Sequence, residues 1–202
     1  FGLQVEAGRY SEILLLFMEI FLRQEYRLSP TGPHPRIIDA GGNIGFATLF
    51  FKLVWPGARI LTVEPSPASF AVLQRNLSLN GFADVEARQV AVSGRRGTLD
   101  FYVDPDQPTS ARSSTMSGRG GQQVIRVDAV PLSELIDEPV DFLKLDVEGA
   151  EMEVIPELAR SGKLPLIREM VIEYHHHVVA GEDRLSELLR ILETEGFGYT
   201  LH

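Results

Sequence analysis

The sequence RIIDAGGNIGFATLFF, residues 36–51, decides the fold of this protein. An apolar run ends on Asp39, three glycines follow at positions 41, 42 and 45, and a second apolar run continues with helical spacing. In a doubly wound α/β sheet the first strand-to-helix turn binds ligands, because the amides of the helix N-terminus point outward beside the strand ends. Glycines there let a ligand approach the backbone closely. The stretch therefore predicts a strand, a ligand-binding turn and a helix.

The same alternation of apolar patterns continues along the chain. It predicts strands at 36–40, 59–63, 85–92, 98–103, 141–146 and 169–174, and helices at 46–53, 69–80, 151–161 and 183–196. Strands separated by helices indicate βαβ units and a doubly wound, mostly parallel sheet, so the expected fold class is α/β. The polar segment 104–123 interrupts this pattern. Because structureless segments of this length are uncommon in compact domains, we expect a surface loop or a substrate lid there.

The N-terminal part has a different character. Residues 11–23 have helical spacing and are apolar on most of the circumference, so this helix packs either on the main domain or across a homodimer. The segment LSPTGPHPR, residues 28–36, contains three prolines and a glycine and marks a boundary. We therefore expect an N-terminal helical extension over residues 1–35 and a ligand-binding domain over residues 36–202.

Composition excludes several classes of protein. Nineteen basic and 28 acidic residues give a net charge of -9, which disfavours nucleic acid as the main partner. The chain contains no cysteine, which excludes disulfides, thiolate metal sites and cysteine nucleophiles and fits a cytoplasmic location. The longest apolar block, residues 13–22, includes Glu19 and is too short to span a membrane. We expect a cytoplasmic protein without a membrane span.

Three kinds of glycine loop were compared with the stretch after the first strand. A P-loop requires Lys-Ser or Lys-Thr after its last glycine, which this chain lacks. A dinucleotide fingerprint requires glycine where Asn43 and Phe46 stand. The remaining pattern, formed by Asp39, Gly41 and Gly45, resembles motif I of S-adenosylmethionine-dependent methyltransferases. Asn43 replaces a frequent glycine of that motif and tolerates left-handed backbone angles.

Glu64 follows the second predicted strand in the sequence VEPSP. A carboxylate at this place can accept hydrogen bonds from both hydroxyls of a ribose. NAD is held by the same acid in dehydrogenases. Glu64 therefore indicates a nucleoside-containing ligand and leaves methyltransferase and NAD-dependent oxidoreductase both open.

A later sequence, VDFLKLDVEGAEMEVI at residues 140–155, resembles the hallmark of the FkbM family of methyltransferases. Four further family motifs occur in the family's order: IDAGGNIG at 38–45, VEPSP at 63–67, NLSLNG at 76–81 and VIEYH at 171–175. The resemblance covers residues 36–177. It implies a class I methyltransferase (Rossmann-like) fold, S-adenosylmethionine as cofactor, and O-methylation of a hydroxyl on a small molecule, a sugar, a glycan or another natural product.

The resemblance also assigns cofactor-binding residues by position. It places Asp39, Gly41, Gly42, Asn43 and Gly45 at the methionine end, Glu64 at the ribose, Gln89, Val90 and Ala91 at the adenine, and Asp146 facing the methyl group. Methyltransferase sheets normally continue with an antiparallel strand after a segment such as GFGYTLH, with which this sequence stops. The expected domain is therefore either short or incomplete at its C-terminal end.

An alcohol must lose a proton when it is methylated, either to a nearby base or with the help of a cation. Asp146, Glu148, Glu173 and His175 are the candidates, because the ends of neighbouring strands would gather them around one cleft. His175 is the first choice as base, since its ordinary pKa of about 6.5 suits neutral pH; Asp146 and Glu173 complete the predicted catalytic set. Glu148, with Glu151, also fits a second role, which is to complement the positive end of the helix that follows.

The sequence predicts no metal site, because it contains no compact ligand spacing of the kind that marks zinc sites. Lys144 lies in an otherwise apolar strand and shares a face with Asp146. An unpaired buried ammonium is costly, so we expect a carboxylate partner, Glu173. Two alternatives to an active methyltransferase stay open: a catalytically silent S-adenosylmethionine-binding module in a biosynthetic assembly, and an NAD-dependent oxidoreductase.

Overall fold

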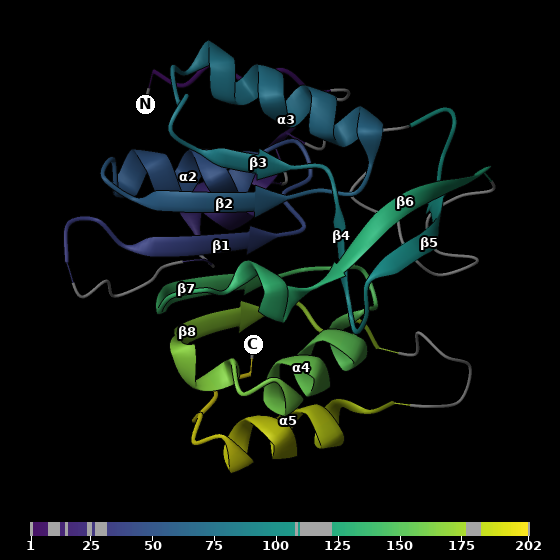
Figure 1. Ribbon diagram of the computed structural model, residues 1–202. Coiled ribbons are helices and arrows are strands. Elements are labelled where there is room, and N and C mark those ends of the chain that lie inside the picture. The colour runs from purple at the N-terminus through teal and green to yellow at the C-terminus, as the bar shows by residue number, and fades with distance from the viewer. Residues whose placement is uncertain are drawn as a thin grey trace.

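The computed structural model describes residues 2–7, 13–14, 16–23, 26, 32–107, 109, 123–176 and 183–201. Its centre is a five-stranded parallel sheet in the order β3-β2-β1-β7-β8 (Figure 1). These strands are β1 (Arg36–Ala40), β2 (Arg59–Val63), β3 (Glu86–Arg88), β7 (Val140–Leu145) and β8 (Ile167–Ile172). Because β2 and β7 lie on opposite sides of β1, the strand order reverses there, which is where α/β sheets bind ligands.

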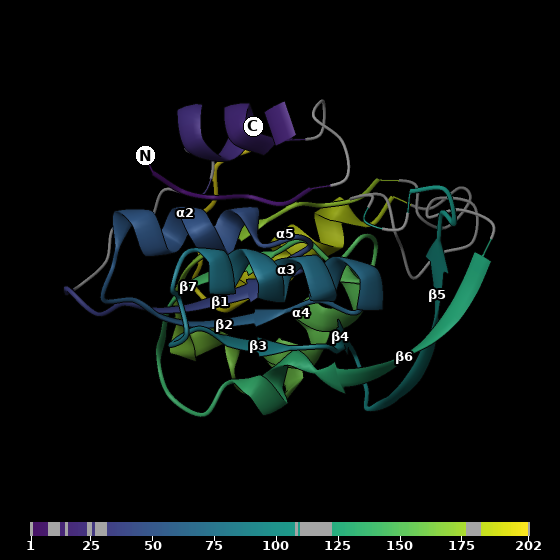
Figure 2. The same ribbon diagram turned by 90° about the horizontal axis from the view of Figure 1, so that it is seen from above.

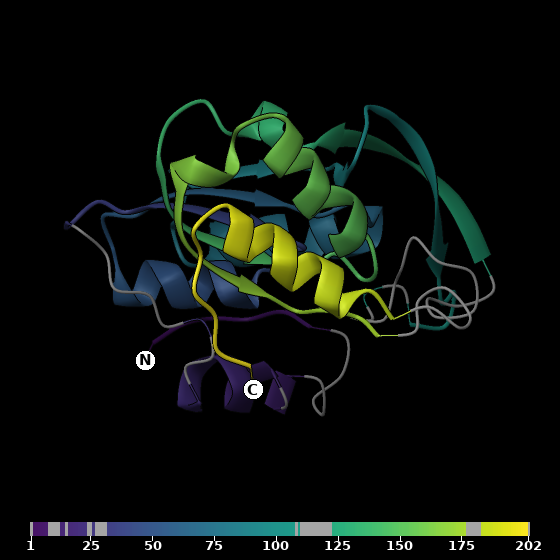
Figure 3. The same cartoon turned by 90° about the horizontal axis from the view of Figure 1, so that it is seen from below.

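Helices cover both faces of this sheet. They are α2 (Phe46–Val54), α3 (Pro67–Leu79), α4 (Glu151–Arg160) and α5 (Leu185–Thr194). One core cluster joins Ile37 and Phe142 of the sheet to Phe51 of α2, and a second joins Leu143 to α4 and α5. Figure 3 shows α4 and α5 side by side. Alternate residues of β1 and β7 thus face opposite helical layers, as expected for strands buried on both faces.

The N-terminal segment adds a further layer outside α2. Its short helix η1 (Phe17–Leu22) is a single π-helical stretch that lies over α2 (Figure 2). The ring of Phe21 packs edge-on against the rings of Phe46 and Phe50, at centroid distances of 6.3 and 5.4 Å. The predicted helix over 11–23 is described only in part, and within the described part it packs on the main domain. None of the helices in the described ranges is long and apolar enough to cross a membrane.

A smaller sheet stands beside the end of β3. It consists of β4 (Ala91–Ser93), β6 (Gln123–Pro131) and β5 (Gly97–Val103), with β4 parallel and β5 antiparallel to the central β6 (Figure 1). The prediction of one strand over 85–92 is therefore wrong. The chain leaves the large sheet after β3, crosses two residues and enters the small sheet as β4, because β6 offers a second set of backbone partners.

The strand β6 and the short 3-10 helix η2 (Leu132–Leu135) after it were missed by the sequence interpretation. The signal was present, since Val127 and Ala129 are buried while Arg126 and Asp128 are exposed, which is the period of a strand. A further short helix, η3 (Leu164–Leu166), precedes β8. The remaining predicted strands and helices lie within two residues of their observed bounds, and most of the segment 104–123 lies outside the described residues.

Candidate active site

A pocket opens at the carboxyl ends of β1, β2 and β7. Its wall includes residues 41–43 after β1, Glu64 after β2, residues 90–92 at the start of β4, and Asp146 and Glu148 after β7. Phe101 of the small sheet contributes to the wall, as do Leu16, Ile20 and Tyr26 of the N-terminal segment. These four apolar and aromatic residues carry no motif and could not be found from the sequence, because they reach the pocket only when separate layers pack together.

The glycine turn, residues 41–45, has left-handed backbone angles at Gly41 (φ 89°), Asn43 (φ 47°) and Gly45 (φ 92°). A Cβ atom at Gly41 would lie 1.8 Å from the backbone oxygen of Asp146, and one at Gly42 would lie 2.2 Å from Oγ1 of Thr62. These glycines are therefore required by the packing of β1 against its neighbours, as well as by any ligand.

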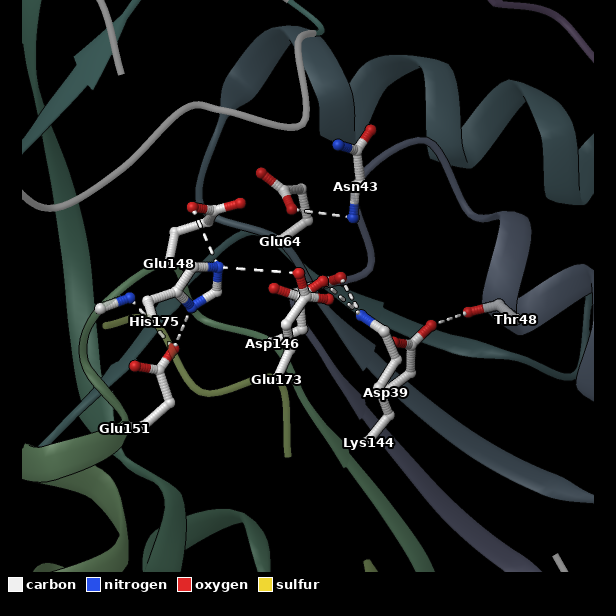
Figure 4. Close-up of polar contacts among 12 residues, drawn as sticks. Asp39, Asn43, Thr48, Glu64, Lys144, Asp146, Glu148, Glu151, Glu173 and His175 are labelled. Carbon is white, nitrogen blue, oxygen red and sulfur yellow. Dashed lines mark hydrogen bonds and ion pairs between the residues drawn. The ribbon is translucent and has the colours of Figure 1, made fainter. Parts of the chain in front are cut away.

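Glu64 holds the glycine turn in place. Its Oε2 accepts a hydrogen bond from the amide of Asn43 (2.9 Å), and its Oε1 accepts one from the amide of Ser66 (2.8 Å), as Figure 4 shows in part. The side chain is buried at the pocket wall. Burial raises the pKa of Glu64 to about 7, although both amides favour the charged form. The predicted ribose acid thus lies at the pocket with both oxygens already engaged by the backbone.

Asp39, the other acid of the first motif, does not line the pocket. Its Oδ2 accepts a hydrogen bond from Oγ1 of Thr48 on α2 (2.7 Å), and its Oδ1 lies 3.4 Å from Nζ of Lys144. The side chain is completely buried beneath the glycine turn. Asp39 therefore stabilises the region under the glycine turn through its contacts with Thr48 and Lys144.

Lys144 lies between the glycine turn and Asp146 and contacts both. Its Nζ donates to the backbone oxygen of Gly41 (2.7 Å) and lies 3.3 Å from Oδ2 of Asp146. Although burial alone disfavours the ammonium, the carboxylates of Asp146 and Asp39 raise the pKa of Lys144. The shared face with Asp146 is confirmed. The predicted partner Glu173 is wrong, because the side chain reaches toward β1 and not toward β8.

The predicted catalytic residues come together around one imidazole. His175 is buried, its Nδ1 lies 2.8 Å from Oε1 of Glu151, and its Nε2 lies 3.4 Å from Glu148 and 3.8 Å from Glu173 (Figure 4). Burial alone disfavours the imidazolium, but the hydrogen bond to Glu151 and the charges of Glu151, Glu148 and Asp146 raise the pKa of His175. We call Asp146, Glu148, Glu173 and His175 the strand-end cluster.

Glu151 is the contact that the sequence interpretation missed. It is the first residue of α4, where a carboxylate complements the positive end of a helix. The sequence interpretation assigned Glu151 that role alone and did not predict its contact with His175. Its Oε1 accepts a hydrogen bond from the amide of Gly149 (3.0 Å) and contacts His175. The sequence spacing could not reveal the pair, because the two residues are 24 positions apart and follow different strands.

The carboxylates of the strand-end cluster differ in their surroundings. Glu173 is 58% exposed; burial of its inner part, followed by the charge of Asp146, raises the pKa of Glu173. Asp146 lines the pocket, and its Oδ1 is buried without a hydrogen-bond partner in the described part of the chain. This end of the pocket therefore concentrates negative charge beside an imidazole.

At the predicted adenine end, the structure separates the three assigned residues. Val90 and Ala91 line the pocket together with Val92 and Phe101. Gln89 is exposed and lies outside the pocket wall. The bend between β3 and β4 turns Gln89 outward, so the apolar wall begins one residue later than expected.

The sequence is similar to those of known methyltransferases. Residues 39–201 match the methyltransferase FkbM domain. Methyltransferase 1 of Beauveria bassiana (strain ARSEF 2860) is 30% identical over 207 residues, which cover 92% of this chain and 81% of the relative. Methyltransferase sdnD of Sordaria araneosa is 31% identical over 208 residues, which cover 84% of this chain and 80% of the relative.

A third relative is a 2-O-methyltransferase, NoeI, of Sinorhizobium fredii (strain NBRC 101917 / NGR234). It is 29% identical over 187 residues, which cover 75% of this chain and 75% of the relative. The parallel sheet with helices on both faces agrees with the class I methyltransferase fold, for which S-adenosylmethionine is the methyl donor. The chain belongs to the FkbM family of methyltransferases.

Proposed function

We propose that this protein is an O-methyltransferase that transfers a methyl group from S-adenosylmethionine to a hydroxyl of a sugar, a glycan or another natural product. The observation that carries the proposal is one pocket with two chemically different ends. The glycine turn and Glu64 form one end, and Asp146 and Glu148 form the other. His175 and Glu173 are outside the pocket wall, where His175 contacts Glu148. The 2-O-methyltransferase NoeI supports transfer to oxygen by its similarity.

The residues at the first end fit the cofactor. Oδ1 of Asn43 is buried without a hydrogen-bond partner among the described residues, so it is available to a polar group of a ligand. The glycine turn, with Oδ1 of Asn43, would hold the methionine part, Glu64 the ribose, and Val90 with Ala91 the adenine. Bound there, S-adenosylmethionine supplies an electrophilic methyl group on sulfur. Asp39 and Gly45 would act indirectly, by shaping the turn.

The residues at the second end fit an alcohol acceptor. Its hydroxyl has to give up a proton, and Nε2 of His175 is directed toward the carboxylates of Glu148 and Glu173. Glu151 holds the opposite nitrogen, which fixes the ring. Because the surrounding carboxylates raise its pKa, His175 is a stronger base than a free histidine. Alignment of hydroxyl and methyl group would supply much of the remaining acceleration.

Calorimetric titration tests the cofactor. We expect S-adenosylmethionine and S-adenosylhomocysteine to bind, NAD not to bind, and Glu64→Ala to weaken binding at least tenfold. Glu86→Ala is the matched control, since Glu86 lies on the edge strand β3 and its exposed carboxylate contacts Arg88. Binding of NAD in place of the two sulfur compounds would contradict the proposal.

Transfer of a labelled methyl group to a panel of hydroxylated sugars and polyketides tests the reaction. We expect a methyl ether with at least one member, and loss of the product in His175→Ala. Cofactor binding with no transfer to any hydroxyl in a broad panel would favour the silent binding module instead.

A further inference from the structure

Three side chains of the strand-end cluster each offer a ligand atom to one point. The atoms come from Asp146, Glu148 and His175, and all of them lie within 4.8 Å of one another (Figure 4). Opposite ligands of an octahedral Mg²⁺ ion, each at about 2.1 Å, are about 4.2 Å apart. A small inward rotation of the carboxylate side chains therefore brings the three atoms to coordination distance.

The imidazole already has the partner that metal-ligating histidines use. Such histidines donate their second ring N–H to a carboxylate, which fixes the tautomer and leaves the other nitrogen for the metal. His175 has this arrangement, with Nδ1 2.8 Å from Glu151 and both side chains buried. In the neutral ring with a proton on Nδ1, Nε2 carries a lone pair.

That lone pair faces oxygens which are themselves acceptors. Nε2 lies 3.4 Å from Oε2 of Glu148 and 3.8 Å from Oε1 of Glu173. Two ionised carboxylates and a neutral imidazole nitrogen repel one another unless a positive centre lies between them. Either a proton on Nε2 or a cation meets this requirement.

Asp146 provides an independent sign of a missing positive partner. Lys144 reaches Oδ2 of Asp146 at 3.3 Å, whereas Oδ1 is buried and has no hydrogen-bond partner in the described part of the chain. A buried acceptor without a partner is costly. A carboxylate oxygen of Asp146 lies within 4.8 Å of the ligand atoms of Glu148 and His175, so a cation bound among the three would lie beside this carboxylate.

The geometry points to a divalent cation, Mg²⁺ or Mn²⁺, bound by Asp146, Glu148 and His175. The two carboxylates suit both ions, and the imidazole favours Mn²⁺ over Mg²⁺. An octahedral ion would keep three positions for water and acceptor, so two neighbouring oxygens of one molecule can bind together. The acceptor class is then a vicinal diol or a hydroxyl beside a carbonyl. This assignment rests on the proposed O-methyl transfer.

The cation changes the role of His175 from base to ligand. A hydroxyl bound to the cation is more acidic, and its proton passes to Glu173, which borders the site and is 58% exposed. The hydroxyl oxygen forms the new bond to the methyl carbon as the carbon–sulfur bond breaks, with the electron pair left on sulfur. The products are a methyl ether, S-adenosylhomocysteine and one proton.

Mn²⁺ itself is the probe for this site. The full chain is treated with a chelator, exchanged into metal-free buffer and titrated with Mn²⁺, and free Mn²⁺ is followed by electron paramagnetic resonance. We expect one Mn²⁺ per chain, displaced by excess Mg²⁺, with affinity at least tenfold lower in Glu148→Gln and in His175→Ala. Glu148 is 22% exposed, so Glu148→Gln keeps the test valid if the buried His175→Ala variant unfolds.

His176→Ala is the matched control, because His176 is exposed and its Nδ1 contacts Asp183 at 3.0 Å. We expect it to bind Mn²⁺ like the unmodified chain. Methyl transfer should fall at least tenfold in chelator and return with Mn²⁺. No saturable Mn²⁺ binding, equal binding in Glu148→Gln, or equal methyl transfer in chelator would overturn the cation site.

Calorimetry with S-adenosylmethionine in chelator separates this inference from the proposed function. Cofactor binding together with chelator-resistant methyl transfer would remove the cation and keep the O-methyltransferase. Failure of the cofactor to bind, with Mn²⁺ present or absent, would remove the proposed function and with it the role given to the cation.

Discussion

The two ends of the pocket are held in shape by different forces. At the glycine turn the backbone forms the contacts, since the amides of Gly41 and Gly42 donate to the carbonyl of Val63 and the amide of Asn43 donates to Glu64. At the strand-end cluster, side-chain charges face one another, and Oδ1 of Asp146 has no partner in the described residues. The first end is held in shape by the backbone and leaves Oδ1 of Asn43 without a partner among the described residues, whereas the second has a place for a positive charge.

The largest expected effect is a loss of stability at Gly41, where the glycine turn packs against the backbone of Asp146. Gly41→Ala forces a Cβ atom toward the backbone oxygen of Asp146, 1.8 Å away, and strains a φ of 89°. We expect the free energy of unfolding to fall by about 3 kcal/mol or more. Urea denaturation measures it, with Gly97→Ala as control, because a Cβ there meets nothing within 4 Å. Equal stability of the two variants would refute the tight packing of the ends.

The second expected effect is confined to the strand-end cluster. His175→Ala should lower kcat by about 10²–10⁴-fold, whether the imidazole is base or ligand, and should leave the affinity for S-adenosylmethionine within about threefold. Rates of methyl transfer and calorimetry measure the two quantities, with His176→Ala as control. A matching loss of cofactor affinity would show that the two ends are not separable.

The third prediction concerns Glu64 beside the glycine turn and the dependence of stability on pH. The pKa of Glu64 is raised by burial from 4.5 to about 7 in the folded protein, so the folded state binds the proton more tightly than the unfolded one. Its contribution to stability is present below about pH 4.5 and is lost as pH rises through about 7, by an amount on the order of 3 kcal/mol. Glu64→Gln should flatten that decline in the cofactor-free protein. An equal pH dependence of the free energy of unfolding in Glu64→Gln and in the unmodified chain would contradict this prediction.

The smallest expected effect tests how His175 is positioned. Glu151→Gln keeps the size of the side chain and removes its charge, and we expect kcat to fall about 10–100-fold with a shifted pH profile and an unchanged KM for the cofactor. Glu153→Gln removes a charge from the same first turn of α4 without touching His175. If the two variants have the same kcat and the same pH profile, Glu151 stabilises only the N-terminal end of α4 and does not position His175.

Much of the fold was predictable because it follows from local patterns. The apolar runs of β1 and β2 have the predicted bounds, since residues buried on both faces of a parallel sheet leave an unbroken apolar signal. The strand expected over 85–92 failed because a short edge strand depends on the partner that it finds. The strand β6 alternates clearly, yet it was not recognised after a long polar segment.

The site was predictable where its residues share a motif. Residues 41–43 and Glu64, which the sequence assigned to cofactor binding, lie together at the pocket wall, because each follows a strand whose end lies at the same edge of the sheet. The partner of Lys144 was predicted wrongly, since alternation gives the face of a strand and not the neighbour toward which a long side chain turns. Phe101 was missed because no motif marks it.

The sequence by itself determined the family, the parallel sheet and the glycine turn between β1 and α2, because short-range patterns specify strands, helices and the backbone angles between them. Only the tertiary structure decided that Glu151 holds His175 and that Asp146, Glu148 and His175 share one point. These contacts join residues from the ends of two strands and the start of a helix. Their distances depend on how β7, β8 and α4 pack, which no spacing along the chain encodes.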